Sequence, residues 1–271
     1  MEKDVRSYEF ASAIIDYIKI VGISVRKAIA EEPNTPVDVL KFLSKDKESS
    51  VRLSVAKNYN TPVQSLALLS KDENGIVRKN VANNPSASAE TLMLLSKDKN
   101  AGVRCMVALN SSTSTETLAE LSMDENEIVR KKVVQNPNAS YKILAELSDD
   151  EDKYVRSCVA VNANTSLEII AKLSDDENKV VRSYVAANAN TSAKILVKLS
   201  KDESSYVRGH VASNLSTPAE ILIELSKDED QDVRENVAQN PNTPIKIIAK
   251  LSRDKVNSVR QSGRNTLKHK S

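Results

Sequence analysis

The sequence predicts an all-α protein that repeats a two-helix unit of 26 residues about ten times. Arginine stands at every multiple of 26 from Arg26 to Arg260, each time after valine, and no insertion or deletion breaks the register. The 271 residues include no Trp, two Phe and seven Tyr, so we expect an aliphatic core. Only five Gly and eight Pro argue against a chain of many tight β-turns.

Two polar columns accompany the repeated arginine. An Asp precedes nine of the ten arginines by six positions, and an Asn follows eight of them by six. Side chains that recur at one place in every unit are expected to link stacked units, Arg and Asp through charge-assisted hydrogen bonds and Asn as a helix cap. Each Arg–Asp pair contributes only about 0.2–1 kcal/mol if it is exposed. This predicted structural ladder comprises Arg52, Arg78, Arg104, Arg130, Arg156, Arg182, Arg208 and Arg234, with Asp72, Asp98, Asp124, Asp150, Asp176, Asp202 and Asp228, and with Asn84, Asn110, Asn136, Asn162, Asn188, Asn214 and Asn240.

The first helix of each unit is illustrated by residues 122–136. Ser122 and Glu125 match a capping box, which satisfies free N–H groups at a helix start. Val129 and Val133 then lie four positions apart and form one apolar stripe. Asn136 is expected to close the helix in the left-handed conformation that helix ends often need.

The second helix is expected to begin at Thr-Pro pairs such as Thr61-Pro62, with Ser replacing Pro in other units. Thr suits the N-cap and Pro the first helical position. Its body follows the pattern of Ile195, Leu196 and Leu199. Roughly ten residues are too few for a helix to stand alone, so packing on neighbours must stabilise it. The pattern leaves open whether this helix is α or partly 3₁₀.

The repeated motif Val-Arg-x-x-Val-Ala-x-Asn-Pro-Asn-Thr, followed by Ile-Leu-x-x-Leu-Ser-x-Asp, resembles the unit of the leucine-rich repeat variant family over residues 24–262. The Asp-x-x-x-x-Val-Arg part also resembles the second helix of HEAT repeats. The resemblance implies a right-handed α-solenoid. The founding member's iron–sulfur module needs more cysteines than the two present, so it is not carried over, and no cofactor or metal is expected.

We expect one solenoid domain over residues 1–271, with a capping helix at 1–22, repeats at 23–262, and a polar cap with a basic tail at 263–271. Ile14 and Tyr17 fall in the apolar columns of the second helix. Gly263 and Arg264 replace the Val-Ala core pair, as befits a last repeat without a neighbour.

Several function classes find little support. The net charge of +2 gives no general attraction to nucleic acid or acidic membranes. The most apolar stretch, Phe10 to Ile23, is too short and too charged to cross a bilayer, and two cysteines favour a reducing cytoplasm. With only His210 and His269, no catalytic set or metal-ligand spacing can be assembled, and no small-molecule substrate is evident. We therefore expect a cytoplasmic protein that is not an enzyme.

The variable positions of the first helix, two before and two after each Arg, are neighbours on one surface. In the middle of the array this surface is apolar and rich in tyrosine, and we predict that it binds a protein or peptide partner. The second helix carries charges at its outer positions from Glu120 onward, so we assign the first helix to the concave layer and the second to the solvated convex layer. The predicted partner-binding residues are Ile128, Tyr154, Cys158, Val180, Tyr184, Tyr206 and His210.

Three alternatives remain open at this point. Tight curvature of the array would bury part of the apolar surface. A nucleic-acid-binding solenoid needs a row of basic residues. The positions two before, two after and five after each Arg hold only Lys57 and Lys132 as basic residues, against the acidic Glu31 and Asp232. The array could also serve as a purely structural spacer in a larger assembly.

Overall fold

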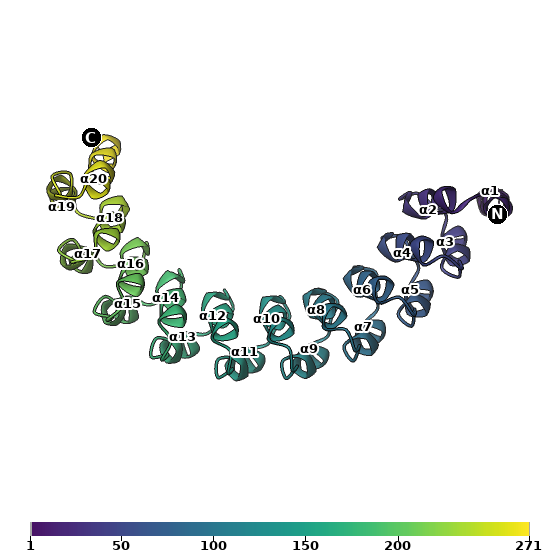
Figure 1. Cartoon of the computed structure of the whole chain (residues 1–271), viewed down its shortest axis with the longest axis horizontal. Coiled ribbons are helices and arrows are strands. Elements are labelled where there is room, and N and C mark those ends of the chain that lie inside the picture. The colour runs from purple at the N-terminus through teal and green to yellow at the C-terminus, as the bar shows by residue number, and fades with distance from the viewer. Residues whose placement is uncertain (1, 271) are drawn as a thin grey trace. The chain divides into compact units, whose positions relative to one another are not determined.

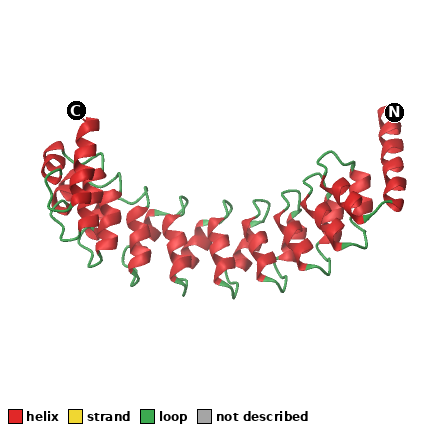
Figure 2. Ribbon diagram, turned by 45° about the horizontal axis from the view of Figure 1, so that its top comes forward, coloured by secondary structure: helices red, strands yellow, loops and turns green. Residues whose placement is uncertain are grey.

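A computed structural model of the chain describes the backbone of residues 2–270 and the side chains of residues 9–269. Within this range the chain forms twenty helices and no strand (Figures 1 and 2). The contacts divide it into two compact units, of which the first ends at Ser140 and the second starts at Tyr141. Both units are rows of the same helical repeat, so the predicted all-α solenoid of 26-residue repeats is confirmed. The expectation of one continuous domain stays a prediction.

The helix bounds repeat almost unchanged along the chain. The first unit contains α1 (Glu2–Ile20), α2 (Ile23–Glu31), α3 (Val37–Leu43), α4 (Ser49–Lys57), α5 (Val63–Leu69), α6 (Gly75–Asn83), α7 (Ala89–Leu95), α8 (Ala101–Leu109), α9 (Thr115–Leu121) and α10 (Glu127–Gln135). The second unit contains α11 (Tyr141–Leu147), α12 (Lys153–Val161), α13 (Leu167–Leu173), α14 (Lys179–Ala187), α15 (Ala193–Leu199), α16 (Ser205–Ser213), α17 (Ala219–Leu225), α18 (Gln231–Gln239), α19 (Ile245–Leu251) and α20 (Asn257–Lys270). The second helix of each repeat is therefore α, although it has seven residues rather than about ten.

Within each unit the helices form two layers. The even-numbered helices lie directly against one another, from α2 to α10 in the first unit and from α12 to α20 in the second. Most odd-numbered helices pack mainly on the even-numbered helix that follows or precedes them (Figure 1). The core lies between the layers, where Val77 and Val81 of α6 and Leu92 of α7 are fully buried. This thin aliphatic core agrees with the scarcity of aromatic residues.

The start of the nine-residue helices differs from the expected capping box. Ser122 lies at the end of α9, where its hydroxyl donates to the carbonyl of Ala119 at 2.8 Å. The N-cap of α10 is Asn126, whose side-chain oxygen accepts the N–H of Ile128 at 2.9 Å. The Ser122–Glu125 capping box is therefore wrong, because an Asn closer to the helix satisfies its free N–H groups.

The Thr-Pro pairs lie one position earlier relative to the second helix than expected. The Thr61 hydroxyl donates to the carbonyl of Val55 at 2.6 Å and so ties the loop to the end of α4. Pro62 takes the N-cap position, and α5 begins at Val63. Where Ser stands in place of Pro, as at Ser114, its hydroxyl accepts an N–H of the helix.

Both ends of the chain carry longer helices. The buried side chains of α1 are Ala11 and Ile18, whereas Tyr17 is 51% exposed, so the match of Tyr17 to a core column was wrong. At the other end, α20 runs on through Gly263, where a Cβ atom would lie 2.7 Å from the backbone nitrogen of Ser252. The missing side chain lets α20 pack closely on the end of α19.

Candidate interaction surface

The arginine column joins each repeat to the next. Arg156 donates through Nε and Nη2 to the carboxylate of Asp176 in the following repeat, at 2.6 and 3.0 Å. Its Nη1 donates at 2.7 Å to the backbone carbonyl of Asp150, the aspartate of its own repeat. The same pairing joins Arg26 to Asp46, Arg52 to Asp72, Arg78 to Asp98, Arg104 to Asp124, Arg182 to Asp202, Arg208 to Asp228 and Arg234 to Asp254. Arg130 donates through Nη1 to the carbonyl of Asp124 at 2.8 Å.

These pairs are much less exposed than the weak surface pairs considered above. The side chains of Arg182 and Asp202 are 11% and 7% exposed. Burial alone would raise the pKa of Asp202, but the Arg182 guanidinium and the N–H of Ser204 together hold it below its usual value. Breaking one such bidentate pair leaves a carboxylate without its partner and therefore costs more than losing an exposed pair.

The asparagine column joins the repeats a second time. Asn84 donates through Nδ2 to the carbonyls of Ala56 and Asn58 in the preceding repeat, both at 2.9 Å, and its Oδ1 accepts the N–H of Ser86. The same donation to the alanine carbonyl of the preceding repeat is made by Asn58, Asn110, Asn136, Asn188, Asn214 and Asn240, while Asn162 accepts the N–H of Asn164.

The expected left-handed conformation of these asparagines is wrong. Asn84 has φ −75° and ψ 125°, and no residue of the described chain has a positive φ. The column uses Asn because only a side-chain amide can donate twice to carbonyls and also accept a backbone N–H.

The candidate surface lies on the outer side of the even-numbered layer in the second unit. Tyr154 on α12, Tyr184 on α14 and Tyr206 on α16 are 51%, 40% and 53% exposed. Curvature therefore does not bury these three tyrosines. Cys158, Val180 and His210 lie beside them and are half-buried. We call these six residues the tyrosine strip. Ile128, on α10, is 45% exposed and belongs to the first unit.

A column of small residues lies beside the tyrosine strip and was not singled out from the sequence. The residue directly after the arginine is Ser157 on α12, Ser183 on α14 and Gly209 on α16, and all three are buried. The hydroxyls of Ser157 and Ser183 donate to carbonyls of their own helices at 2.7 Å, so the contact zone holds no unsatisfied donor there. Small residues allow neighbouring helices to approach closely. The run of small residues in the sequence could therefore have predicted close packing of these helices.

The rings of the strip also interact with their neighbours. Tyr206 and His210 lie one helical turn apart, with ring centroids at 4.8 Å and planes at 88°. Burial lowers the pKa of His210, which therefore stays neutral near pH 7. The Lys153 ammonium lies 5.2 Å from the centroid of the Tyr154 ring, within cation–π range.

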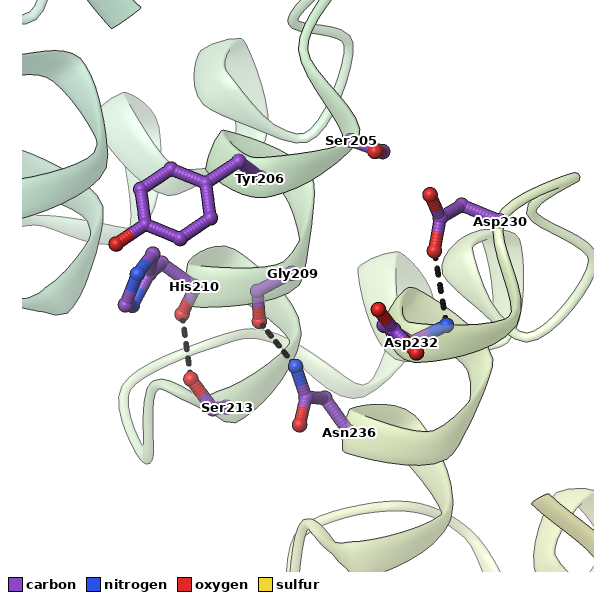
Figure 3. A pocket seen from close by; sticks show the side chains of 8 residues that line it. All are labelled: Ser205, Tyr206, Gly209, His210, Ser213, Asp230, Asp232 and Asn236. Carbon is purple, nitrogen blue, oxygen red and sulfur yellow. Dashed lines mark hydrogen bonds between the residues drawn. The ribbon is translucent and has the colours of Figure 1, made fainter. Parts of the chain in front are cut away.

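A pocket of about 410 Å³ lies between α16 and α18 at one end of the strip (Figure 3). Tyr206 and His210 stand on one side of it, and Asp230 and Asp232 stand on the other (Figure 3). Between these walls, Asn236 donates through Nδ2 to the carbonyl of Gly209 at 3.2 Å (Figure 3). The pocket is further lined by Ser205, Ser213 and Asn236.

The Asp230 carboxylate of this pocket remains ionised at neutral pH. The Ser205 hydroxyl and the N–H of Asp232 lower the pKa of Asp230. Asp232 is exposed at the start of α18. An aromatic ring opposite a carboxylate is an arrangement that binds a basic side chain, because both groups attract a cation.

Other chemistry is sparse in the described part of the chain. No group of three or more His, Cys, Asp or Glu side chains among residues 9–269 is placed to hold a metal ion. Cys105 is buried and Cys158 half-buried, and no disulfide joins them. No helix within the described range has the length and apolar character needed to cross a membrane.

Comparison with known proteins identifies the fold. No family model matches the sequence, and no curated protein matches it. A solved structure described as a leucine-rich repeat variant with a novel repetitive structural motif is 26% identical, with a TM-score of 0.62 over 79% of this chain and 85% of that one. An engineered protein is 19% identical over 98% of this chain and 96% of that one, with a TM-score of 0.38. A designed armadillo repeat protein is 15% identical over 86% and 98%, with a TM-score of 0.27. The first of these confirms the resemblance predicted from the repeat, whereas the other two carry no argument.

Proposed function

We propose that this chain, a helical-repeat solenoid of the leucine-rich repeat variant type, is a non-catalytic scaffold whose second unit binds a peptide segment of a partner protein along the tyrosine strip. The observation that carries the proposal is the exposure of Tyr154, Tyr184 and Tyr206 on three successive even-numbered helices. Tyrosine supplies a large contact area at little conformational cost and is enriched at the energetic centres of protein interfaces.

Basic residues stand near one end of the tyrosine strip and acidic residues near the other, so we expect a bound segment to lie in one orientation. Lys153 and Lys179 stand at the first turns of α12 and α14, whereas Asp230 and Asp232 stand in the pocket at the α16–α18 end. We expect apolar side chains of the segment to lie on the tyrosines and a lysine or arginine to enter the pocket.

Nucleic acid fits this surface less well. A phosphate backbone requires a row of cations along its path, and each phosphate contact adds to the salt dependence of binding. The six residues of the tyrosine strip include no lysine or arginine, and the pocket beside it is acidic.

The test is the selection of a phage-displayed random peptide library on the intact protein. Selected peptides are then titrated against wild type and against the triple variant Tyr154→Ser, Tyr184→Ser, Tyr206→Ser. The matched control replaces Tyr17, Tyr59 and Tyr141 by Ser, since these tyrosines are at least as exposed but lie outside the strip.

We expect the strip variant to lose binding by about thirtyfold or more, since truncated aromatic anchors cost roughly 2 kcal/mol or more in total, and the control to bind like wild type. Asp232→Asn should selectively weaken peptides that carry a basic residue. Equal loss in both triple variants, with circular dichroism unchanged, would refute the tyrosine strip as the binding site.

A further inference from the structure

The odd-numbered layer has the same small pocket in both units, and the charge differs at three of its positions. In the second unit a pocket of about 340 Å³ is lined by Asp149, Lys172 and Asp175. Four repeats earlier, in the first unit, the equivalent pocket of about 470 Å³ is lined by Lys45, Leu68 and Lys71. Its remaining residues are Ser44, Asp46, Arg52, Leu69, Asp72 and Glu73, which match Ser148, Asp150, Arg156, Leu173, Asp176 and Glu177 of the other pocket type for type.

An ion pair between repeats occupies this place in the second unit. The Lys172 ammonium lies 2.5 Å from the Asp149 carboxylate and donates to the Ser148 hydroxyl at 3.0 Å. One repeat further on, Lys198 pairs with Asp175 in the same way at 2.5 Å. The charged side chains at these positions of the second unit are therefore neutralised by one another in ion pairs.

In the first unit the lysines have no such partner. Leu68 takes the place of Lys172 and stands beside Lys45, and Leu94 takes the equivalent place beside Lys71. Among the described residues, neither Lys45 nor Lys71 forms an ion pair. Phe42, at the same position one repeat before Leu68, borders a neighbouring pocket together with Lys45.

These five residues form what we call the basic–apolar stripe, which comprises Phe42, Lys45, Leu68, Lys71 and Leu94. Phe42, Leu68 and Leu94 are 39%, 46% and 57% exposed. The stripe ends where Glu120 restores the pairing by approaching Lys97 at 3.7 Å. The charged outer positions that the sequence shows from Glu120 onward are therefore replaced by apolar side chains at Phe42, Leu68 and Leu94.

We infer that the basic–apolar stripe docks an acidic amphipathic segment of a partner protein, one that alternates apolar side chains with carboxylates. Such a segment would cover the exposed Phe42, Leu68 and Leu94. It would also supply carboxylates to Lys45 and Lys71, which form no ion pair with any described residue. At the positions of Lys45 and Lys71 the second unit has Asp149 and Asp175, each paired with a lysine of the next repeat, which shows that this place accommodates an ion pair.

A lipid surface fits the stripe less well than a protein segment. The Glu73 side chain, on the rim of the Leu68 pocket, is 88% exposed, and Asp38 stands on α3 with its side chain 55% exposed. A bilayer with anionic lipids would face these carboxylates over the same area. A narrow peptide can follow the stripe between them.

The distance between neighbouring repeats determines how far apart the carboxylates of the docked segment must be. Packed helices lie about 8–10 Å apart, and an extended chain advances about 3.3 Å per residue. A carboxylate at every third residue therefore meets successive lysines. This inference concerns the first unit and is independent of the tyrosine strip.

The experiment uses the full chain and a fluorescein-labelled peptide of repeated Glu-Leu-Thr triplets, measured by fluorescence anisotropy. The double variant Lys45→Asp, Leu68→Lys transplants the pair that the second unit already holds, so the fold accommodates it. The reciprocal variant Asp149→Lys, Lys172→Leu recreates the open pocket in the second unit.

We expect wild type to bind the acidic peptide, the first double variant to bind it at least about tenfold more weakly, and the reciprocal variant to bind it more tightly than wild type. The tyrosine-strip variant should bind it like wild type. No binding of the acidic peptide, equal binding of a Lys-Leu-Thr peptide, equal affinity in wild type and both double variants, or binding to phosphatidylserine vesicles in place of the peptide would each overturn the inference.

Discussion

The replacement Asn84→Asp tests how the repeats are held together. It keeps the shape of the side chain but removes both donations to the carbonyls of Ala56 and Asn58, which lie at 2.9 Å. Asn84 is 2% exposed, so water does not replace the lost donors. A buried charge without a partner costs about 3–5 kcal/mol, whereas Asn84→Ala, which loses three hydrogen bonds of about 1 kcal/mol each, costs about 3 kcal/mol.

The pH dependence follows from the pKa of the introduced carboxyl group. Two carbonyl oxygens at this distance disfavour its charged form, so its pKa in the folded state rises above the ordinary value of about 3.9. The unfolded chain releases the proton as pH rises through about 4, while the folded chain keeps it. The stability of the variant relative to wild type is therefore highest below pH 4 and falls as pH rises, until the folded group ionises as well.

Urea denaturation followed by circular dichroism at several pH values measures this difference directly. The matched control is Asn83→Asp, which places the same charge on an exposed neighbour of Asn84 and should cost no more than about 1 kcal/mol. A difference between Asn84→Asp and wild type that is under 1 kcal/mol, or that does not change with pH, would refute the asparagine ladder as a source of stability.

Three further predictions address the ladder, the strip and the end of the chain. Arg182→Ala should lower stability by about 3–5 kcal/mol in denaturant titrations, because it leaves the buried Asp202 without its guanidinium partner. The lowered pKa of Asp202 means that the contribution of this pair is present at neutral pH and disappears as pH falls through that pKa, so wild type and variant should converge in acid. NMR titration of His210 should give a pKa below 6.5, because burial disfavours the imidazolium; an unshifted value would contradict the burial of that ring. Gly263→Ala should destabilise the C-terminal end by about 1–3 kcal/mol and raise hydrogen exchange in α20, whereas Gly22→Ala, with open space around it, should have little effect.

The fold was predictable because the same residue pattern recurs about ten times at a constant spacing of 26 residues. Arginine at every multiple of 26 fixed the length of the repeat, and the alternation of Val-Ala and Ile-Leu cores fixed two helices within it. The local capping chemistry was harder to predict. Asn84 and Thr61 were assigned to their own helices, but Asn84 bonds to carbonyls of the preceding repeat, and Thr61 bonds to a carbonyl six residues earlier. A sequence pattern suggests caps within a single helix. It does not reveal hydrogen bonds between repeats, because these depend on how the repeats stack.

The surfaces were predictable in part for a similar reason. The helical step of 100° per residue placed Tyr154, Tyr184 and Tyr206 on one outer side, where the structure has them exposed. The pocket between α16 and α18 combines side chains of two neighbouring repeats, which no single column reveals. The apolar outer positions of Phe42 and Leu68 went unnoticed because the convex layer was judged from the repeats that begin at Glu120.

The most direct test of the proposed function is tyrosine footprinting of the full chain, by iodination and mass spectrometry, with and without a peptide selected on wild type. The chain carries its own controls, since Tyr17, Tyr59 and Tyr141 are exposed at positions outside the tyrosine strip. We predict that the bound peptide slows modification of Tyr154, Tyr184 and Tyr206 and leaves the other three unchanged. Protection of the control tyrosines with the strip still reactive would contradict the proposal and place the partner on another surface.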